Sequence, residues 1–290
     1  MTGAVRHFPV MLFLVSTITA VGACGSCASE PGANKESAVD LLSSLPTDLQ
    51  ADDAVPLEYH VTSTFYNRLA NGTLRSKAQI TAEFTRSAED GDVNCRWNDV
   101  RVAAPANPED QFQPGTVLDF MEDFSYAMSE GIIGEELYSD IPDGDLKHLL
   151  KTLVWDAAML EPVFWDHFDE LRLNEDFVIP DFEDFSIAMG NWGVLRMKNL
   201  KMRWMGISKV NGETCALLGY RSLANPVQYG AMAGTNGRSL YWGSICVSLE
   251  DKQVEYATMI EDVFLEMPVP GESAPRAMNL QREVTFEHMP

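Results

Sequence analysis

Three carboxylates in one short segment are the residues whose types and spacing first indicate chemistry. Asp166 and Glu170 are four positions apart, so they share one face if the segment is helical. Asp169 and His167 lie between them. Because carboxylate oxygens suit Ca²⁺ and Mg²⁺, Asp166, Asp169 and Glu170 are candidate metal ligands. The alternative interpretation is a solvated acidic face without a bound ion.

These carboxylates belong to a strongly acidic block. Residues 105–190 hold 21 acidic and only three basic residues, and the whole chain has a formal net charge of -22. Like charges at this density repel one another and attract cations or a basic protein. The charge argues against nucleic-acid binding and against adhesion to anionic lipid through a polybasic patch. A basic protein is therefore one expected partner, and nucleic acid is not.

The sequence lacks the motifs of several common enzyme classes. Gly243-Ser244-Ile245 resembles a nucleophile elbow but lacks its second glycine. The sequence has no zinc-protease motif, P-loop or dinucleotide fingerprint. We therefore expect no catalytic residue and no cofactor. A hydrolase with a dispersed site, built on His60 or His167 with carboxylates, remains an alternative.

Methionine and tryptophan offer a different kind of site. The chain has 14 methionines and six tryptophans. Methionine side chains are adaptable, and surfaces rich in them accept varied apolar ligands. The candidates to line a ligand site are Met121, Met128, Trp155, Met159, Met202 and Trp204. An ordinary filled core is the alternative interpretation of the same residues.

The first 23 residues have the pattern of a signal peptide. A weakly basic start at Arg6 precedes an apolar run over residues 8–21 and then the small residues Gly22 and Ala23. The run is shorter than the roughly 20 apolar residues of a transmembrane helix. We therefore expect export, with no membrane-spanning segment in the mature chain.

The residues around the expected cleavage site resemble a lipid-attachment motif. Val21-Gly22-Ala23-Cys24 is similar to the lipobox of bacterial lipoproteins, in which two small residues precede a cysteine that receives diacylglycerol. The resemblance implies lipid on Cys24 and anchoring at the cell envelope. Gly25 and Ser26 stand where an aspartate would favour inner-membrane retention, which implies the outer membrane, facing the periplasm. Ordinary cleavage that leaves a free Cys24 is the alternative.

Two later cysteines are candidates for a disulfide. Cys215 and Cys246 lie in strand-like segments, and an exported protein meets an oxidising compartment. They would pair if their strands are neighbours. Buried, unpaired thiols are the alternative.

Alternating apolar residues predict the elements that must position these groups. Residues 57–69 and 74–84 alternate on either side of Asn71-Gly72, a strong hairpin signal. A third strand is expected over 93–102. Later strands are expected over 195–207, 214–222, 239–249, 254–265 and 278–287, with a turn at Asn211-Gly212. Strands joined by short turns predict an antiparallel meander.

Helical spacing predicts a different structure between the third strand and the later ones. Over 114–130 the apolar residues lie close to a helical spacing. After a turn at residues 142–145, Leu149, Leu150, Leu153, Val154 and Ala157 form one apolar stripe. We therefore expect a helical insertion over 105–190, after the third strand.

The expected fold class is α+β: a curled, half-barrel-like antiparallel meander of about eight strands with a helical insertion. The expected organisation is a signal peptide over 1–23, a flexible tether over 24–54 and one domain over 55–290. This architecture distantly resembles the half-barrel of periplasmic carriers of lipoproteins and lipids, a resemblance that implies an apolar ligand.

These patterns support three hypotheses of function. The first is an exported lipoprotein that binds or carries an apolar ligand or lipid. The second is a structural or interaction protein of the cell envelope that docks a basic partner through the acidic block. The third is a hydrolase with a dispersed site.

Overall fold

The structure is a computed structural model of the chain. It describes residues 56–89, 92–127, 135–141, 144–159, 167, 170–180, 186–188, 194–228, 236–250, 253–267 and 276–289. The chain separates into two units, residues 1–35 and 36–290, and all described residues belong to the second. The expected signal peptide, Cys24 and the whole of the expected tether therefore lie outside the described residues.

In the described part of the chain, thirteen strands form one antiparallel sheet. Eight of them are long: β1 (Leu57–Leu69), β2 (Leu74–Glu89), β3 (Asp92–Ala103), β9 (Lys201–Val210), β10 (Glu213–Gln228), β11 (Asn236–Ser248), β12 (Val254–Met267) and β13 (Arg276–His288). Five are short: β4 (Thr116–Val117), β5 (Phe124–Ala127), β6 (Phe177–Val178), β7 (Ser186–Ala188) and β8 (Val194–Arg196). The expected count of about eight is therefore too low, because it includes the long strands and omits the short ones.

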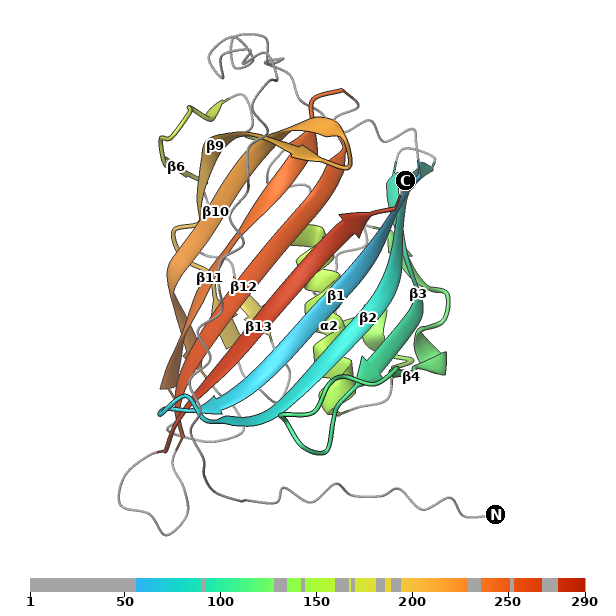
Figure 1. Ribbon diagram of the computed structural model, residues 1–290, viewed down its shortest axis with the longest axis vertical. Helices are drawn as coiled ribbons and strands as arrows, with labels where there is room; N and C mark the ends of the chain where they lie inside the picture. Colours follow the sequence, from blue (N-terminus) through green and yellow to red (C-terminus); the bar gives the residue numbers. More distant parts are fainter. Residues whose placement is uncertain are drawn as a thin grey trace, which may run out of the picture. The chain divides into compact units, whose positions relative to one another are not determined.

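The strand order places the first and the last strand of the chain, β1 and β13, side by side. It runs β4-β3-β2-β1-β13-β12-β11-β10-β8-β7, and β9 also pairs with β10. Figure 1 shows the middle of this order, from β3 to β10. Val61 of β1 lies directly opposite Phe286 of β13. The sheet is therefore two meanders that meet at β1 and β13, where each strand satisfies the backbone groups along one side of the other.

Both expected Asn-Gly turns are present. Gly72 has φ +85° in the turn between β1 and β2. Asn211 and Gly212, with φ 53° and 91°, connect β9 to β10. At Asn211-Gly212, positive φ at both central residues is the geometry that matches the twist of a two-residue hairpin. The first turn is longer: of its Asn-Gly pair Gly72 alone has positive φ, and the Gly72 N–H donates to the Leu69 carbonyl at 2.8 Å. Local turn chemistry thus fixes the register of both hairpins.

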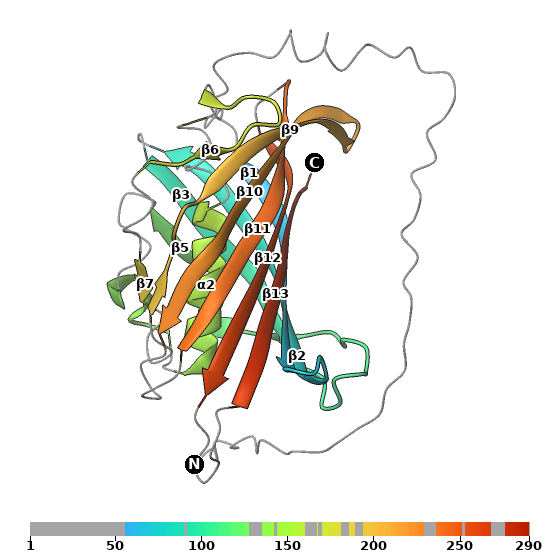
Figure 2. The same cartoon turned by 90° about the vertical axis from the view of Figure 1, so that its left-hand side faces the viewer.

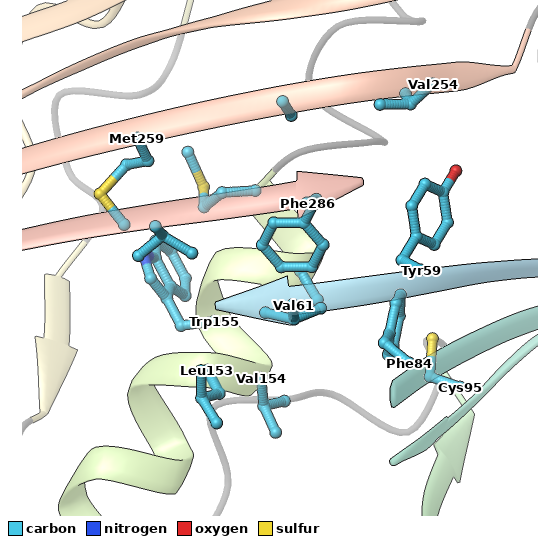
Figure 3. Packing of buried hydrophobic residues seen from close by; sticks show 14 of the residues in the cluster. Tyr59, Val61, Phe84, Cys95, Leu153, Val154, Trp155, Val254, Met259 and Phe286 are labelled. Carbon is cyan, nitrogen blue, oxygen red and sulfur yellow. The ribbon is translucent and has the colours of Figure 1, made fainter. Parts of the chain in front are cut away.

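Helix α2 (Asp145–Met159) covers one face of the sheet, which we call the inner face (Figure 2). The predicted apolar stripe is confirmed, since Leu150, Leu153 and Val154 are at most 1% exposed. They belong to the same core as Val61 and Phe286 of the sheet (Figure 3). Burial of this stripe, at about 25 cal/mol per Å² of apolar surface, is the main force that holds the helix on the sheet.

The helix expected over residues 114–130 is wrong. The structure has β4, a single 3-10 turn at Asp119–Met121, and then β5. Both strands pair with β3, with Trp97 opposite Phe124. The apolar spacing of this segment predicted a helix, but the open edge of β3 offers backbone groups for pairing. Pairing along that edge outweighs the local helical preference in a segment rich in aromatic residues.

The expected helical insertion is therefore only partly helical, and its short strands pair with part of each edge of the sheet. At one edge β4 and β5 pair with β3, and at the other β6 pairs with β9 and β7 with β8. The paired stretches of these edge strands have no free backbone groups to offer another chain. None of the helices in the described part of the chain is long and apolar enough to cross a membrane.

Candidate functional site

A row of polar side chains crosses the otherwise apolar inner face. Arg282 lies directly opposite Glu261, Glu261 opposite Tyr241, and Tyr241 opposite Ser222, so the row extends over four strands. Apolar residues flank the row along β13, where Leu280 and Val284 stand two positions before and two positions after Arg282 and share its face. We call these residues, with their polar neighbours, the polar stripe; its members are Asp156, Ser222, Asn225, Ser239, Tyr241, Glu261 and Arg282.

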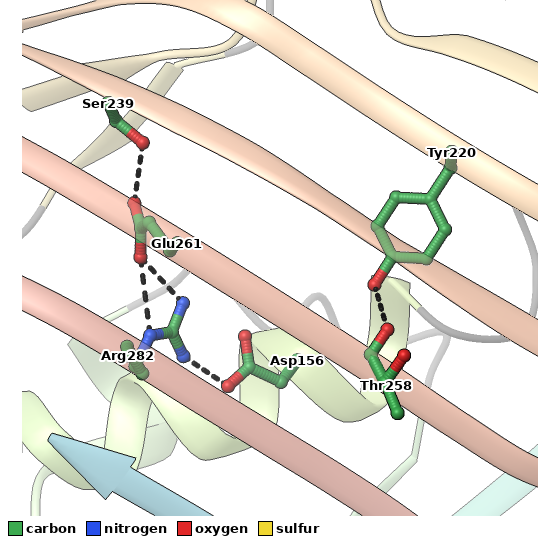
Figure 4. Close-up of polar contacts among 6 residues, drawn as sticks. All are labelled: Asp156, Tyr220, Ser239, Thr258, Glu261 and Arg282. Carbon is green, nitrogen blue, oxygen red and sulfur yellow. Dashed lines mark hydrogen bonds and ion pairs between the residues drawn. The ribbon is translucent and has the colours of Figure 1, made fainter. Parts of the chain in front are cut away.

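Charge-assisted hydrogen bonds connect helix α2 to the stripe (Figure 4). Arg282 donates from Nε and Nη2 to Glu261 Oε2, at 3.2 and 2.8 Å. Its Nη1 donates to Asp156 Oδ2 on α2. The Ser239 hydroxyl donates to Glu261 Oε1 at 2.7 Å. Asp156 is 1% exposed, Arg282 6% and Glu261 8%, so this network lies in the interior.

The network holds two carboxylates against one guanidinium. Burial raises the pKa of Asp156 to about 7, and the nearby Glu261 raises it as well, although Arg282 opposes both. Burial disfavours the charge on Arg282, but the two carboxylates outweigh it and raise its pKa. Among the described residues, Asp156 Oδ1 has no hydrogen-bond partner. An unsatisfied buried polar atom costs about 1–3 kcal/mol, and more if it is charged.

A second polar contact fastens the far end of the stripe. The Asn225 side-chain oxygen accepts from the backbone N–H of Lys198 at 2.8 Å, and Asn225 Nδ2 donates to the Ser222 carbonyl at 3.2 Å. The Ser222 hydroxyl lies within hydrogen-bond distance of Asn225 Oδ1, at 2.6 Å, and of the Lys198 carbonyl. Ser222 and Asn225 are buried, so these bonds fix the chain before β9 onto β10.

One glycine lets a tyrosine reach across a neighbouring strand. The Tyr220 hydroxyl donates to the Thr258 carbonyl at 3.0 Å, although β11 lies between their strands (Figure 4). Gly243 of β11 lies directly opposite both Tyr220 and Met259 on the inner face. A Cβ at Gly243 would collide with the Thr258 carbonyl and the Tyr220 hydroxyl, and would lie 2.6 Å from the Tyr220 ring. The glycine is therefore required by close packing.

Gly243→Ala is expected to lower the free energy of unfolding by about 1–3 kcal/mol, since overpacking forces the Tyr220 ring and the backbone of β12 to shift. Chemical denaturation measures this loss. Gly72→Ala is not a matched control, because alanine tolerates the positive φ of Gly72 poorly. Ala216→Gly, in the neighbouring strand β10, controls for an exchange of alanine and glycine within the sheet that causes no collision with Tyr220. An unchanged unfolding free energy for Gly243→Ala would contradict the packing assigned here.

The candidate ligand-lining residues mostly join the core. Met121, Trp155, Met159 and Met202 are buried members of the main core, and Trp204 packs against it. Met128 lies outside the described residues. Five of the six candidates therefore belong to the core or pack against it, as the filled-core interpretation also expects.

The candidate metal ligands are only partly described. Asp166 and Asp169 lie outside the described residues. Glu170 is exposed, and its Oε1 lies 3.5 Å from His167 Nδ1. In the described ranges, no group of three or more His, Cys, Asp or Glu residues is arranged to hold a metal ion. His60, considered for a hydrolase, is exposed on β1 opposite Glu83 and Glu287.

The disulfide considered between Cys215 and Cys246 is not formed in the structure. Both are buried free thiols. Cys215 lies opposite Ser248 and Cys246 opposite Leu217, so the two are diagonal neighbours on adjacent strands. Diagonal neighbours are about 7–8 Å apart, whereas disulfide-bonded cysteines usually have Cα atoms about 5.5–6 Å apart. The strand register therefore keeps the thiols separate.

Both thiols are expected to be unreactive in the folded protein. Burial, with smaller contributions from Cys246 and nearby carboxylates, raises the pKa of Cys215 to about 12, and burial raises that of Cys246. Because the thiolate is the reactive form, iodoacetamide at pH 8 should modify neither until the protein unfolds. Peptide mapping after labelling checks this. A disulfide-linked peptide pair, or rapid labelling of the folded chain, would contradict it.

Sequence reasoning missed the polar stripe, although a signal was present. In β13 the apolar residues Met278, Leu280, Val284 and Phe286 occupy every second position, and Arg282 stands at the position that continues this alternation. Glu261 likewise stands among the inward residues of β12. A single charge in the apolar phase of a strand marks a buried polar group, because a strand directs every second side chain to the same face.

Comparison with known proteins assigns no family. No family model matches the chain, and no curated protein matches it. One solved structure with detectable similarity is a DUF1329 family protein from Desulfovibrio piger, at 10% sequence identity, covering 82% of this chain and 87% of that chain. The TM-score is 0.13, so this likeness supports no conclusion about fold or function.

Proposed function

We propose that the protein is an exported lipoprotein that binds an apolar ligand bearing a polar group, between helix α2 and the inner face of the sheet. The observation that carries the proposal is the polar stripe with its unpartnered Asp156 oxygen. Binding sites for small molecules are commonly apolar walls with a few convergent polar groups, which is the composition of this face. Export and anchoring are supported by the signal-peptide pattern and by the lipobox at Cys24.

Stability alone gives little reason for such a stripe. Replacing a buried ion-pair network with apolar residues of similar size is often neutral or stabilising, because desolvation offsets the attraction between the charges. The two carboxylates of Asp156 and Glu261 outnumber the single guanidinium of Arg282, so hydrogen-bond acceptors are left over. A ligand whose head group donates hydrogen bonds would use the acceptor that the protein leaves free.

The architecture supports a carrier. The segment between β3 and β9 connects opposite sides of the open strand order and brings α2 onto the inner face. A large open sheet with a helix against one face resembles, at a distance, the half-barrel of periplasmic lipoprotein and lipid carriers. This resemblance concerns arrangement alone and favours an apolar ligand or lipid over a water-soluble substrate.

Native mass spectrometry of the full chain after gentle extraction tests the proposal. The expected result is a mass increment from a co-purified lipid, or from added phospholipid. The matched variant is Asp156→Leu/Glu261→Leu/Arg282→Met, which should fold and bind less. A chain that stays empty with added phospholipid would refute the carrier, and undiminished binding by the folded triple variant would exclude the stripe as the site.

Anchoring is tested separately at Cys24. We expect Cys24→Ala to move the protein from the membrane fraction to the soluble fraction of the periplasm, since the acidic chain would lose its lipid. Cys27→Ala is the matched control and should leave partitioning unchanged. If Cys24→Ala stays in the same membrane fraction, the lipobox interpretation is wrong.

Exposed carboxylates favour the second candidate, a structural or interaction protein of the cell envelope. In the described part of the acidic block they include Glu109, Asp110, Asp119, Glu122, Asp123, Glu136 and Asp140, all of them exposed. Such a surface would dock a basic protein partner through attraction that salt weakens. Cross-linking at low and high salt tests it: a cross-linked partner that persists unchanged at high salt would contradict an electrostatic contact.

A further inference from the structure

The buried network beneath helix α2 holds unequal numbers of positive and negative groups. Asp156 and Glu261 are two carboxylates, and Arg282 is the one guanidinium that contacts them among the described contacts. All three side chains lie in the interior. When both carboxylates are ionised, the network therefore carries one uncompensated negative charge, which is costly away from water.

The missing partner belongs to one particular atom. Both oxygens of Glu261 accept hydrogen bonds, one from Ser239 and the other from Arg282. Of the two Asp156 oxygens, Oδ2 accepts from Arg282, whereas Oδ1 has no hydrogen-bond partner among the described residues. Figure 4 shows a dashed bond on only one of these two oxygens. Because buried acceptors are nearly always paired, a donor that arrives with a ligand has a defined target at Asp156 Oδ1.

Two tyrosines complete the ionisable surroundings of Asp156. Tyr220 of β10 and Tyr241 of β11 have ring centroids 5.5 Å apart. Burial raises the pKa of both hydroxyls, and the charge of Asp156 contributes to the rise, so both hydroxyls stay protonated at neutral pH. The charged groups that act on Asp156 are Arg282 of β13 and Glu261 of β12. A hydroxyl oxygen has two acceptor lone pairs, so Tyr241 can supply a further acceptor near Asp156.

Charge and hydrogen-bonding chemistry select one kind of head group for these acceptors. An ammonium group brings a positive charge together with N–H donors, so it would neutralise the surplus carboxylate and satisfy Asp156 Oδ1. A hydroxyl would donate a hydrogen bond but leave the charge uncompensated, and a carboxylate or phosphate would add a second one. A calcium ion takes six to eight oxygen ligands, more than the acceptors available here.

We propose that the inner-face site binds a long-chain ligand whose head group is a primary ammonium, held by Asp156 Oδ1. This inference rests on the proposed apolar-ligand site and names the chemistry of its head group. The ammonium enters with its charge, and Asp156 releases its proton to the solvent, so the proton and the ligand compete for the same carboxylate. A free alkylamine and the ethanolamine head group of a phospholipid share this chemistry.

Isothermal titration calorimetry with dodecylamine, dodecanol and dodecanoate tests the charge of the head group. The protein is the full chain carrying Cys24→Ala, so that neither a lipid anchor nor detergent competes with the probe. At pH 8 dodecylamine is expected to bind about ten-fold more tightly than dodecanol, since a charge-assisted hydrogen bond is roughly twice as strong as a neutral one. Dodecanoate is expected to bind more weakly than both.

The exchange of a proton for the ammonium gives a second readout. Burial raises the pKa of Asp156 to about 7, whereas an alkylammonium keeps its proton up to about pH 10. Binding of dodecylamine should therefore tighten about ten-fold from pH 6 to pH 8, while binding of dodecanol stays nearly constant. At pH 6, titrations in two buffers of different ionisation enthalpy should show the release of about one proton for each amine bound.

Asp156→Asn should abolish both the preference for dodecylamine over dodecanol and the dependence of amine binding on pH. Circular dichroism checks that this variant is folded. Asp176→Asn is the matched control, because it removes a carboxylate that pairs instead with Arg203 and Arg221, and it should leave amine binding unchanged. If Asp156→Asn does not fold, the pH dependence and the proton release of the natural Asp156 still decide the question.

The remaining outcomes separate this inference from the proposed function. Equal binding of dodecylamine and dodecanol at pH 8, or an unchanged amine preference in folded Asp156→Asn, would overturn the ammonium and leave the apolar-ligand site in place. If none of the three probes binds, both proposals fail. Native mass spectrometry identifies the source of the head group: retention of phosphatidylethanolamine over phosphatidylglycerol supports an aminophospholipid, and retention of dodecylamine alone supports a free amine.

Discussion

Replacing Arg282 by methionine is expected to lower the free energy of unfolding by about 3–5 kcal/mol at neutral pH. The substitution removes the only guanidinium that contacts Asp156 and Glu261 among the described contacts, and it leaves two carboxylates in the interior. Neither can be solvated, because Asp156 is 1% exposed and Glu261 8%. Denaturation followed by circular dichroism measures the loss.

The apolar triple variant is the control for this prediction. Asp156→Leu/Glu261→Leu/Arg282→Met removes both carboxylates together with their partner, so no uncompensated charge stays buried. Its unfolding free energy should return to that of the natural chain or exceed it by about 1–4 kcal/mol. If the triple variant were as unstable as Arg282→Met alone, the network would be stabilising the fold through its packing, and the ion pair would not explain the loss.

Asp156→Asn is expected to change how stability depends on pH. The pKa of Asp156 rises from an ordinary value of 3.8 to about 7 on folding. The folded state therefore keeps its proton where the unfolded state has lost it, so this group makes stability fall as pH rises from about 4 to about 7. Asparagine cannot titrate. Relative to the natural chain, the variant should gain up to about 4 kcal/mol over that window.

Asp176→Asn provides a control with the opposite sign. Burial raises the pKa of Asp176, but the hydrogen bonds from Arg203 and Arg221 outweigh it and lower the pKa overall. Its stabilising contribution is therefore present at neutral pH and lost as the pH falls below the ordinary range of an aspartate. Unfolding free energies of both variants measured from pH 3 to pH 8 separate the two effects. Parallel curves for Asp156→Asn and the natural chain would contradict the raised pKa.

Local sequence signals predicted the parts of the fold that local chemistry controls. The turns at Asn71-Gly72 and Asn211-Gly212 were predictable because asparagine and glycine favour tight turns, and Gly72, Asn211 and Gly212 all have positive φ. The long strands were predictable from alternation, and α2 from its apolar stripe ending at Ala157. Each of these features depends on residues close together in the chain.

Features that depend on distant partners were not predictable in the same way. The segment 114–130 has helical spacing, but its β5 residues pair with β3, which only the folded sheet reveals. The junction of β1 with β13 has no local signal. The polar stripe combines Asp156 of a helix with Glu261 and Arg282 of two strands; alternation can mark Arg282 or Glu261 singly, but no segment shows that the three side chains meet.

The junction of β1 and β13 also constrains the order of events during folding. Residues such as Val61 and Phe286, far apart in the chain, must meet before the two meanders become one sheet. Contacts between distant residues form slowly, because the intervening chain must first lose its freedom. A chain that is synthesised from its N-terminus therefore cannot complete its central strand pair until β13 has emerged. During that delay β1 has an open edge, and this is the stage at which a chaperone would have the most to protect.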